Sequence, residues 1–282
     1  MAVGTSGAAG ADAIARRFVE ARLSASRLDA FPGQIPGDLS SAYAVQDAAI
    51  ALWPDQIVGW KVGRVGPDFE AKHGRERLAG PIFRDSLQRS KDGAAVFFPI
   101  FEGGFAAVEA EFVFEIARDA PVSKTEYTLA EAADYAGRLY IGVETAGSPL
   151  ATINALGPTV VISDFGNNAG LILGKEIPGW RDRPIGDFMC ASFIDGREVG
   201  RGRAIDLPGG PLEALRFLLE HCGKRGRPLK AGQFVSSGAA TGIHEIKAGQ
   251  SAQIDFGRDG EIAVLAVAAK PRSAQPGAKT AH

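Results

Sequence analysis

The chain has 282 residues, of which 45% are hydrophobic and 23% charged. This is an ordinary globular composition, and it excludes a disordered or fibrous chain. The chain has 31 basic and 33 acidic side chains, and its formal net charge of −2 does not indicate a basic surface for nucleic acid or an anionic membrane. No apolar run approaches the ~20 residues of a membrane span, and the first residues lack the pattern of a secretory signal. We therefore expect a soluble cytoplasmic protein with neither nucleic-acid nor membrane partners.

Several common catalytic motifs are missing from the sequence. It contains no G-x-G-x-x-G, G-x-x-x-x-G-K-[ST], H-E-x-x-H, G-x-S-x-G or S-x-x-K, which argues against nucleotide binding, zinc proteolysis and the common serine hydrolase mechanisms. The four histidines are scattered and do not predict a metal site. Cys190 and Cys222 form no C-x-x-C motif, so we expect two buried or partly buried free thiols.

Taken in chain order, the first part of the sequence predicts helices. Residues 1–9 are small and glycine-rich, and we expect a disordered tail there, as at residues 271–282. Residues 10–56 predict a small helical region, whose second helix is capped by Ser40 or Ser41 and extends to Trp53. One apolar stripe marks the first helix: Ile14, Phe18, Ala21, Ala25 and Leu28.

Residues 57–270 predict a β-rich catalytic domain without the regular strand–helix alternation of a doubly wound sheet. Asp195-Gly196 is typical of a tight hairpin turn. Helices are expected over Leu129–Arg138 and Pro211–Cys222. The expected strands are Ile57–Gly63, Ala94–Ile100, Phe105–Ile116, Leu139–Glu144, Phe188–Ile194, Glu198–Ala204, Ala252–Phe256 and Glu261–Ala268.

Two glutamates share one face of the expected strand Phe105–Ile116. Side chains alternate along a strand, so Glu109 and Glu111 project together, ~7 Å apart, from the face opposite Phe112 and its apolar neighbours. Two carboxylates at this spacing repel each other unless a positive charge lies between them. The alternative interpretation is an ordinary charged face that water and salt screen.

A third acid, Glu144, ends another expected strand in apolar surroundings. A carboxylate in such a place costs free energy unless it is paired or bound to a metal. Three carboxylates form an oxygen-rich site, which Mg²⁺, Mn²⁺ or Ca²⁺ prefers and Zn²⁺ does not. Whether Glu144 converges with Glu109 and Glu111 does not follow from their spacing alone.

Two further segments contain candidate binding groups. Lys61 lies in an apolar stretch between Gly59 and Gly63, and it is either an outward-facing lysine of an edge strand or a cation for an anionic substrate. Arg64 follows it and would add a bidentate carboxylate clamp. Residues 234–242, rich in serine and glycine, form either an anion-binding nest or a simple connection.

Six segments carry a resemblance to a known family. They are GWKVG (59–63), AGPIF (79–83), VEAEFVFEI (108–116), GVETAGSPL (142–150), SDFGNNAGLILG (163–174) and LKAGQFVSSGAATG with IKAGQSAQIDFG (229–257). In this order they resemble the fumarylacetoacetate hydrolase superfamily, in particular its 2-keto-4-pentenoate hydratase and oxalocrotonate decarboxylase branch. The resemblance implies an α+β fold, a mixed β-roll or sandwich with peripheral helices.

The same resemblance implies a divalent metal, usually Mg²⁺ with Mn²⁺ or Ca²⁺ as alternatives, and a homodimer or higher homo-oligomer. Position by position, Glu109, Glu111 and Glu144 match the metal carboxylates of the family. Lys61 matches its active-site lysine, which we take as the catalytic residue.

Predicted substrate contacts are fewer and follow the family less closely. Ser237 and Gly238 match a Thr/Ser-Gly contact to the substrate carboxylate, and Asn167 falls at a polar loop position that lines the pocket. Arg64, with the two residues after it, replaces the small polar residues often found behind the lysine motif. Leu78-Ala79 stands where many hydratases carry acids, so a general base assigned there is missing.

The expected activity is metal-dependent addition of water to a 2-hydroxy-2,4-dienoate. In this hypothesis the carboxylate and 2-oxo oxygens of a 2-oxo acid chelate the metal, Lys61 stabilises or protonates the 2-oxygen, and water adds at C4. The same enolate chemistry serves an oxalocrotonate-type decarboxylase or an acylpyruvate or fumarylacetoacetate-type C–C hydrolase. We favour hydration because no water-activating acid–base pair for cleavage is evident. A non-catalytic accessory subunit is the alternative from another class.

Overall fold

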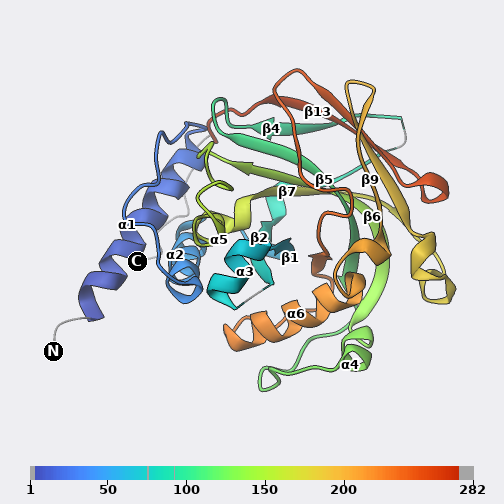
Figure 1. Cartoon of the computed structure of the whole chain (residues 1–282), viewed down its shortest axis with the longest axis horizontal. Helices are drawn as coiled ribbons and strands as arrows, with labels where there is room; N and C mark the ends of the chain where they lie inside the picture. Colours follow the sequence, from blue (N-terminus) through green and yellow to red (C-terminus); the bar gives the residue numbers. More distant parts are fainter. Residues whose placement is uncertain (1–3, 75, 92, 273–282) are drawn as a thin grey trace, which may run out of the picture.

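Two curled β-sheets form the body of the protein in a computed structural model that describes residues 4–74, 76–91 and 93–272 (Figure 1). The larger sheet has the strand order β2 (Arg77–Phe83), β1 (Ile57–Arg64), β10 (Phe234–Ser236), β5 (Phe105–Ile116), β6 (Ala136–Ser148), β7 (Asn168–Glu176) and β3 (Leu87–Arg89), and β11 (His244–Glu245) also pairs with β5. The smaller sheet has the order β4 (Val96–Ile100), β13 (Glu261–Ala268), β12 (Ser251–Asp255), β8 (Met189–Ile194) and β9 (Arg197–Arg203). Both sheets are mixed, because β1–β10, β3–β7 and β4–β13 are parallel pairs.

Helices lie around the sheets and not between regular pairs of strands. Figure 1 shows α1 (Gly4–Leu23) and α2 (Leu39–Leu52) together on one flank, with α4 (Leu129–Ala133) and α6 (Gly210–Lys224) at the lower edge. The shorter α3 (Pro67–His73) and α5 (Pro158–Ser163) lie between them. Buried side chains of α1 and α2 belong to the same hydrophobic cluster as the strands. Across the described ranges, no helix is long and apolar enough to cross a membrane.

Strand β5 matches its predicted bounds and explains how the sheet separates apolar from acidic side chains. One of its faces enters the main hydrophobic cluster with Val108, Ala110, Phe112, Phe114 and Ile116. The predicted alternation is therefore confirmed. The other face carries Glu109 and Glu111, which are also buried, so the interpretation as a solvated charged face is wrong.

The ends of the chain differ from the prediction. Helix α1 begins at Gly4 and therefore includes residues 4–9, where a disordered tail was expected. Ala8 and Ala9 in this segment favour helix, because alanine loses no side-chain entropy on folding. At the other end, Arg272 donates its backbone N–H to the Leu23 carbonyl and its guanidinium pairs with Asp85. The rest of the expected C-terminal tail, residues 273–282, lies outside the described residues.

Several predicted boundaries are also corrected. Helix α1 ends at Leu23, so Ala25 and Leu28 are not part of its stripe, and Leu28 forms a β-bridge with Leu150 instead. Helix α2 is capped by Asp38 and not by a serine, because the Asp38 carboxylate accepts the N–H of Ser41 at 2.8 Å.

In the middle of the chain, the expected helix 129–138 stops at Ala133 and strand β6 extends from Ala136 to Ser148, because pairing with β5 along its length outweighs local helix propensity. Other predictions are confirmed. The hairpin of β8 and β9 turns at Asp195 and Gly196, both with positive φ. Cys190 and Cys222 are buried free thiols.

A buried ion pair fastens α1 to the larger sheet. Arg22 is only 7% exposed and binds Asp164 through two hydrogen bonds of 2.5 and 2.9 Å. Its remaining donors reach the carbonyls of Asn168 and Gly147. Ser148 donates a further hydrogen bond of 2.6 Å to the same aspartate. The pair therefore fixes the segment 164–168, which follows α5 and begins β7.

Replacing Arg22 with methionine is expected to destabilise the protein by about 3–5 kcal/mol, because Asp164 would keep its burial and lose its counter-charge. Urea unfolding followed by circular dichroism measures this change. The double variant Arg22→Met with Asp164→Leu should recover a large part of the loss, since neither charge is then buried. A loss below about 1 kcal/mol for Arg22→Met would contradict the anchoring role.

Candidate metal centre and active site

Three glutamates from two neighbouring strands converge at the centre of the larger sheet. Glu109 on β5 lies directly opposite Glu144 on β6, and Glu111 lies opposite Gly142. One carboxylate oxygen of each glutamate lies within 4.8 Å of the others. Like charges directly opposite each other destabilise a sheet, so this arrangement demands a compensating positive charge.

The three carboxylates are buried, and none of these side chains is more than 4% exposed. Each also keeps one buried oxygen without a hydrogen-bond partner in the described part of the protein: Oε1 of Glu109, Oε1 of Glu111 and Oε2 of Glu144. Buried carboxylate oxygens without partners are costly, whereas oxygen ligands at this spacing suit a hard divalent cation. The residues therefore fit a metal of the Mg²⁺, Mn²⁺ or Ca²⁺ type, and they converge as the metal-site hypothesis required.

Hydrogen bonds from neighbouring strands orient two of the acids. The Ser236 hydroxyl and the Gly238 backbone N–H both donate to Oε2 of Glu111, at 2.6 and 2.8 Å. The Asn168 side-chain amide donates to Oε1 of Glu144 at 3.1 Å. In each of these two glutamates, one carboxylate oxygen accepts these hydrogen bonds and the other oxygen has no partner among the described residues. The arrangement thus holds each carboxylate by one oxygen and leaves the other free for a ligand bond, as outer-shell partners of metal ligands do.

Lys61 supplies the positive charge that the protein itself brings to the cluster. It lies on β1, is buried, and places Nζ 3.3 Å from Oε1 of Glu144. The same ammonium group donates to the Asn167 side-chain oxygen at 3.2 Å. Asn167 is held in turn by a hydrogen bond of 3.1 Å to Asn154. Of the two interpretations of Lys61, the outward-facing edge lysine is therefore wrong.

The segment that presents Asn167 and Asn168 has an unusual backbone. Phe165, Gly166 and Asn167 all have positive φ, between 55° and 66°, a region that non-glycine residues rarely adopt. The segment also packs tightly on β2, where a Cβ added to Gly80 would lie 2.0 Å from the Phe165 carbonyl oxygen. Glycine at position 80 is therefore required for this close approach.

One lysine does not neutralise three buried acids. Burial lowers the pKa of Lys61, but the negative charges of Glu144 and Glu109 outweigh it and hold that pKa above its usual value. Burial, with repulsion from Glu144, raises the pKa of Glu109 to about 8 and holds the pKa of Glu111 well above its usual range. The ion pair of Lys61 with Glu144 is thus satisfied, and a further cation is needed to ionise both remaining acids at neutral pH.

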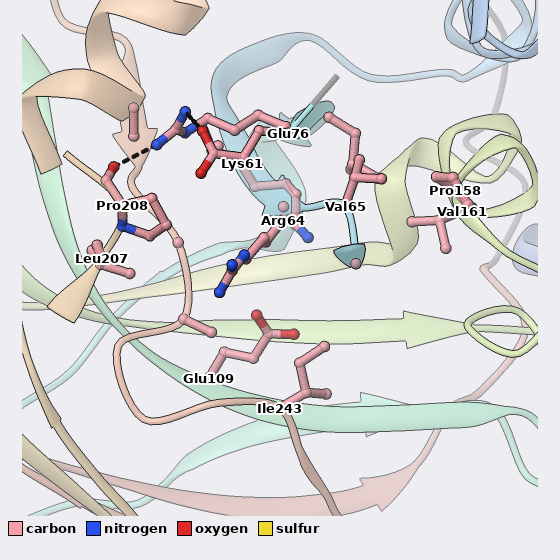
Figure 2. Close-up of a pocket in the computed structure, with 18 of the residues that line it drawn as sticks. Lys61, Arg64, Val65, Glu76, Glu109, Pro158, Val161, Leu207, Pro208 and Ile243 are labelled. Carbon is pink, nitrogen blue, oxygen red and sulfur yellow. Dashed lines mark hydrogen bonds and ion pairs between the residues drawn. The ribbon is translucent and has the colours of Figure 1, made fainter. Parts of the chain in front are cut away.

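Lys61 and Glu109 line a pocket of about 400 Å³ (Figure 2), and Glu111 and Glu144 lie behind its wall. All the predicted substrate contacts line it, namely Arg64, Asn167, Ser237 and Gly238. The Ser237 hydroxyl donates to the Phe112 carbonyl at 2.7 Å, and the Gly238 N–H is taken by Glu111. The Gly238 hydrogen bond therefore orients a candidate metal ligand and the Ser237 hydrogen bond ties its segment to β5, and the contact of both residues with substrate stays a prediction.

Sequence reasoning missed Ser236, Asn154 and Asn168. Ser236 directly precedes the predicted substrate contact Ser237, and Asn168 directly follows the predicted substrate contact Asn167. Only the pairing of β10 with β5 and of β7 with β6 shows that they face the glutamates. The doubled serines and asparagines were the available signal, but they do not reveal which member faces the site.

Comparison with known proteins gives one consistent group. No family model matches the chain. It is 25% identical over 242 residues to a 2-keto-4-pentenoate hydratase of Burkholderia vietnamiensis, with 83% of this chain and 89% of that protein covered.

Solved structures share the fold. The 4-oxalocrotonate decarboxylase of Pseudomonas putida G7 in complex with magnesium and adipate superposes with a TM-score of 0.77 at 17% identity, covering 91% of this chain and 97% of that one. The same decarboxylase has also been described with calcium and acetate. The fumarylpyruvate hydrolase of Pseudomonas aeruginosa, with Mn²⁺ and pyruvate, gives a TM-score of 0.55 at 16% identity, with 76% and 91% covered. The predicted mixed β-roll with peripheral helices is confirmed.

Without a divalent cation, we expect the melting temperature to fall as pH rises from about 5 to about 8.5. The pKa of Glu109 is about 8 in the folded protein against an ordinary 4.5. A raised carboxyl pKa contributes stability at low pH that is lost as pH rises through the folded value. Added Mg²⁺ should raise the melting temperature, and by more at the upper end of this range, because it binds the folded state. Differential scanning fluorimetry in EDTA and in MgCl₂ measures both effects.

The matched variant for this test is Glu111→Gln, which keeps the shape of the side chain and removes one ligand charge. It should lose most of the Mg²⁺-dependent gain. A wild-type melting temperature that responds neither to pH in EDTA nor to Mg²⁺ would contradict the metal centre.

Proposed function

We propose that this chain is a divalent-metal-dependent hydratase of the fumarylacetoacetate hydrolase superfamily, on the basis of its similarity to 2-keto-4-pentenoate hydratases. Its substrate would be a 2-hydroxy-2,4-dienoate and its product a 4-hydroxy-2-oxo acid, with Mg²⁺ as the resident ion. The observation that carries the proposal is the convergence of three buried glutamates, each with a free oxygen, beside a buried lysine at the base of a pocket. The relatives named 2-keto-4-pentenoate hydratase support this activity.

Glu109, Glu111 and Glu144 would hold the cation. When bound, a divalent cation supplies Lewis acidity that polarises the carboxylate and 2-oxygen end of a 2-oxo acid. The hydrogen bonds from Ser236, Gly238 and Asn168 keep two of the three ligands in place before substrate arrives, so little reorganisation is needed during the reaction.

Lys61 would act directly on the substrate. An ammonium group has three N–H donors, and two of those of Lys61 are directed to Glu144 and Asn167. The third is available to the 2-oxygen of a substrate in the pocket, which Lys61 lines. A cation at this point stabilises negative charge on that oxygen while the dienol becomes an α,β-unsaturated 2-oxo acid, to which water adds at C4.

Product analysis tests the activity and its alternatives. We would incubate the Mg²⁺-loaded protein with 2-hydroxypenta-2,4-dienoate, 2-hydroxyhexa-2,4-dienedioate and an acylpyruvate, and follow ultraviolet absorbance, CO₂ and products. Hydration predicts conversion of at least one dienoate to a 4-hydroxy-2-oxo acid without CO₂. Release of CO₂ would identify a decarboxylase, and cleavage of the acylpyruvate a C–C hydrolase. Absence of turnover with all three compounds contradicts the proposal and favours an accessory subunit.

Lys61→Met is expected to lower kcat by at least about 100-fold, because the cation that stabilises negative charge on the 2-oxygen is lost. Its Mg²⁺ affinity should not weaken, since removing a positive charge beside the three acids leaves the site more attractive to a cation. Steady-state kinetics and calorimetric Mg²⁺ titration separate the two effects. The exposed Lys247→Met serves as the matched control and should resemble the wild type. A kcat within twofold of wild type for Lys61→Met would contradict the assigned role.

A further inference from the structure

The pocket contains a cationic side chain that has neither a role in the proposed mechanism nor an acidic partner. Among the described residues, three cations line the cavity: Lys61, Arg64 and Arg77. Lys61 is paired with Glu144, and Arg77 binds both the Glu76 carboxylate, at 2.5 Å, and the Pro208 carbonyl. Arg64, by contrast, has no acidic partner in the described part of the chain.

Each acidic residue described in the pocket wall is either paired with another arginine or part of the metal centre. Glu76 is paired with Arg77, and Asp206 with Arg203 at 3.0 Å. Glu109 belongs to the metal centre. The guanidinium of Arg64 is therefore balanced by none of the described lining residues, although an arginine has five N–H donors in a fork that matches a carboxylate.

The position of Arg64 relative to the metal centre indicates which part of a substrate it would meet. Arg64 is the last residue of β1, three residues beyond Lys61. Figure 2 shows its side chain extending from the strand into the pocket, on the side of Leu207 and Glu109. It is exposed, whereas Lys61 is buried, so Arg64 lies toward the mouth and Lys61 at the base.

The wall around this position is mainly apolar. Its side chains include Val65, Phe69, Pro158, Val161, Leu207 and Ile243. A substrate bound at the base by its 2-oxo acid end directs its far end toward this wall. If that end is hydrocarbon, it offers no acceptor to the guanidinium, whose N–H donors stay with water. If it is a carboxylate, the guanidinium forms a charge-assisted, bidentate pair.

We propose that Arg64 is a specificity-determining residue that binds a second carboxylate, at the end of the substrate opposite the 2-oxo acid. The enzyme would then select 2-oxo and 2-hydroxydienoic dicarboxylic acids over monocarboxylic ones of the same length. The inference rests on the proposed function, because it takes the 2-oxo acid end to lie at Lys61 and the glutamates.

A matched pair of ligands tests the proposal by binding, independently of turnover. 2-Oxohexanedioate and 2-oxohexanoate have the same six-carbon chain and the same 2-oxo acid end, and they differ only in a terminal carboxylate or methyl group. Calorimetric titration of the Mg²⁺-loaded protein should give a Kd for the dioate at least about tenfold lower than for the monoacid.

Variants of Arg64 assign that difference to the guanidinium. Arg64→Leu should raise the Kd for the dioate by about 10–100-fold and leave the Kd for 2-oxohexanoate within about twofold, which abolishes the selectivity. Arg64→Lys should retain part of it, since it keeps the charge but not the fork. Arg16→Leu, which removes an exposed arginine of α1 outside the pocket lining, is the matched control and should behave as wild type.

The possible outcomes separate the inference from the proposed function. Equal Kd values for the two ligands in the wild type, or an equal loss for both in Arg64→Leu, overturn the role of Arg64 and leave the proposed function intact. If neither 2-oxo acid binds although Mg²⁺ does, the proposed function fails and the inference fails with it. Because the wild-type comparison needs no variant, the test remains decisive even if Arg64→Leu does not fold.

Discussion

Glu109 and Glu144 face each other across two neighbouring strands in a buried part of the sheet, and this opposition of like charges is the constraint around which the site is built. Glu111 adds a third negative charge within 4.8 Å. A fold tolerates such a group only if cations compensate it, and the buried Lys61 provides one of them. A divalent ion is the simplest way to compensate the remaining negative charge, and its binding would explain why each glutamate keeps one oxygen without a protein partner.

The order of strands brings together residues that are far apart in the sequence. Lys61, Ser236, the two glutamates of β5, Glu144 and Asn168 come from β1, β10, β5, β6 and β7, which are consecutive in the larger sheet. Each strand contributes a side chain to one face, so the site needs no long flexible loop. The buried pair of Arg22 and Asp164 extends this rigidity to the N-terminal helix, because it fixes the segment that carries both asparagines.

Local patterns predicted what depends on local physics. Alternation in β5 identified its apolar face and both of its glutamates, and the Asp195-Gly196 turn followed from the positive φ that such a hairpin requires. The length of β6 and the roles of Ser236 and Asn168 were not predictable in this way, because strand pairing decides them. The convergence of Glu144 with β5 was a hypothesis for the same reason, and it gained weight only from the resemblance of ordered motifs.

The central claim is that the three glutamates hold one divalent cation beside Lys61. Anomalous diffraction from crystals grown with Mn²⁺ and oxalate tests it most directly, since Mn²⁺ scatters anomalously and oxalate imitates the chelating end of a 2-oxo acid. The account predicts one strong peak per chain within about 2.0–2.6 Å of an oxygen of Glu109, Glu111 and Glu144. Absence of a peak there, or a single peak bound elsewhere, would contradict it.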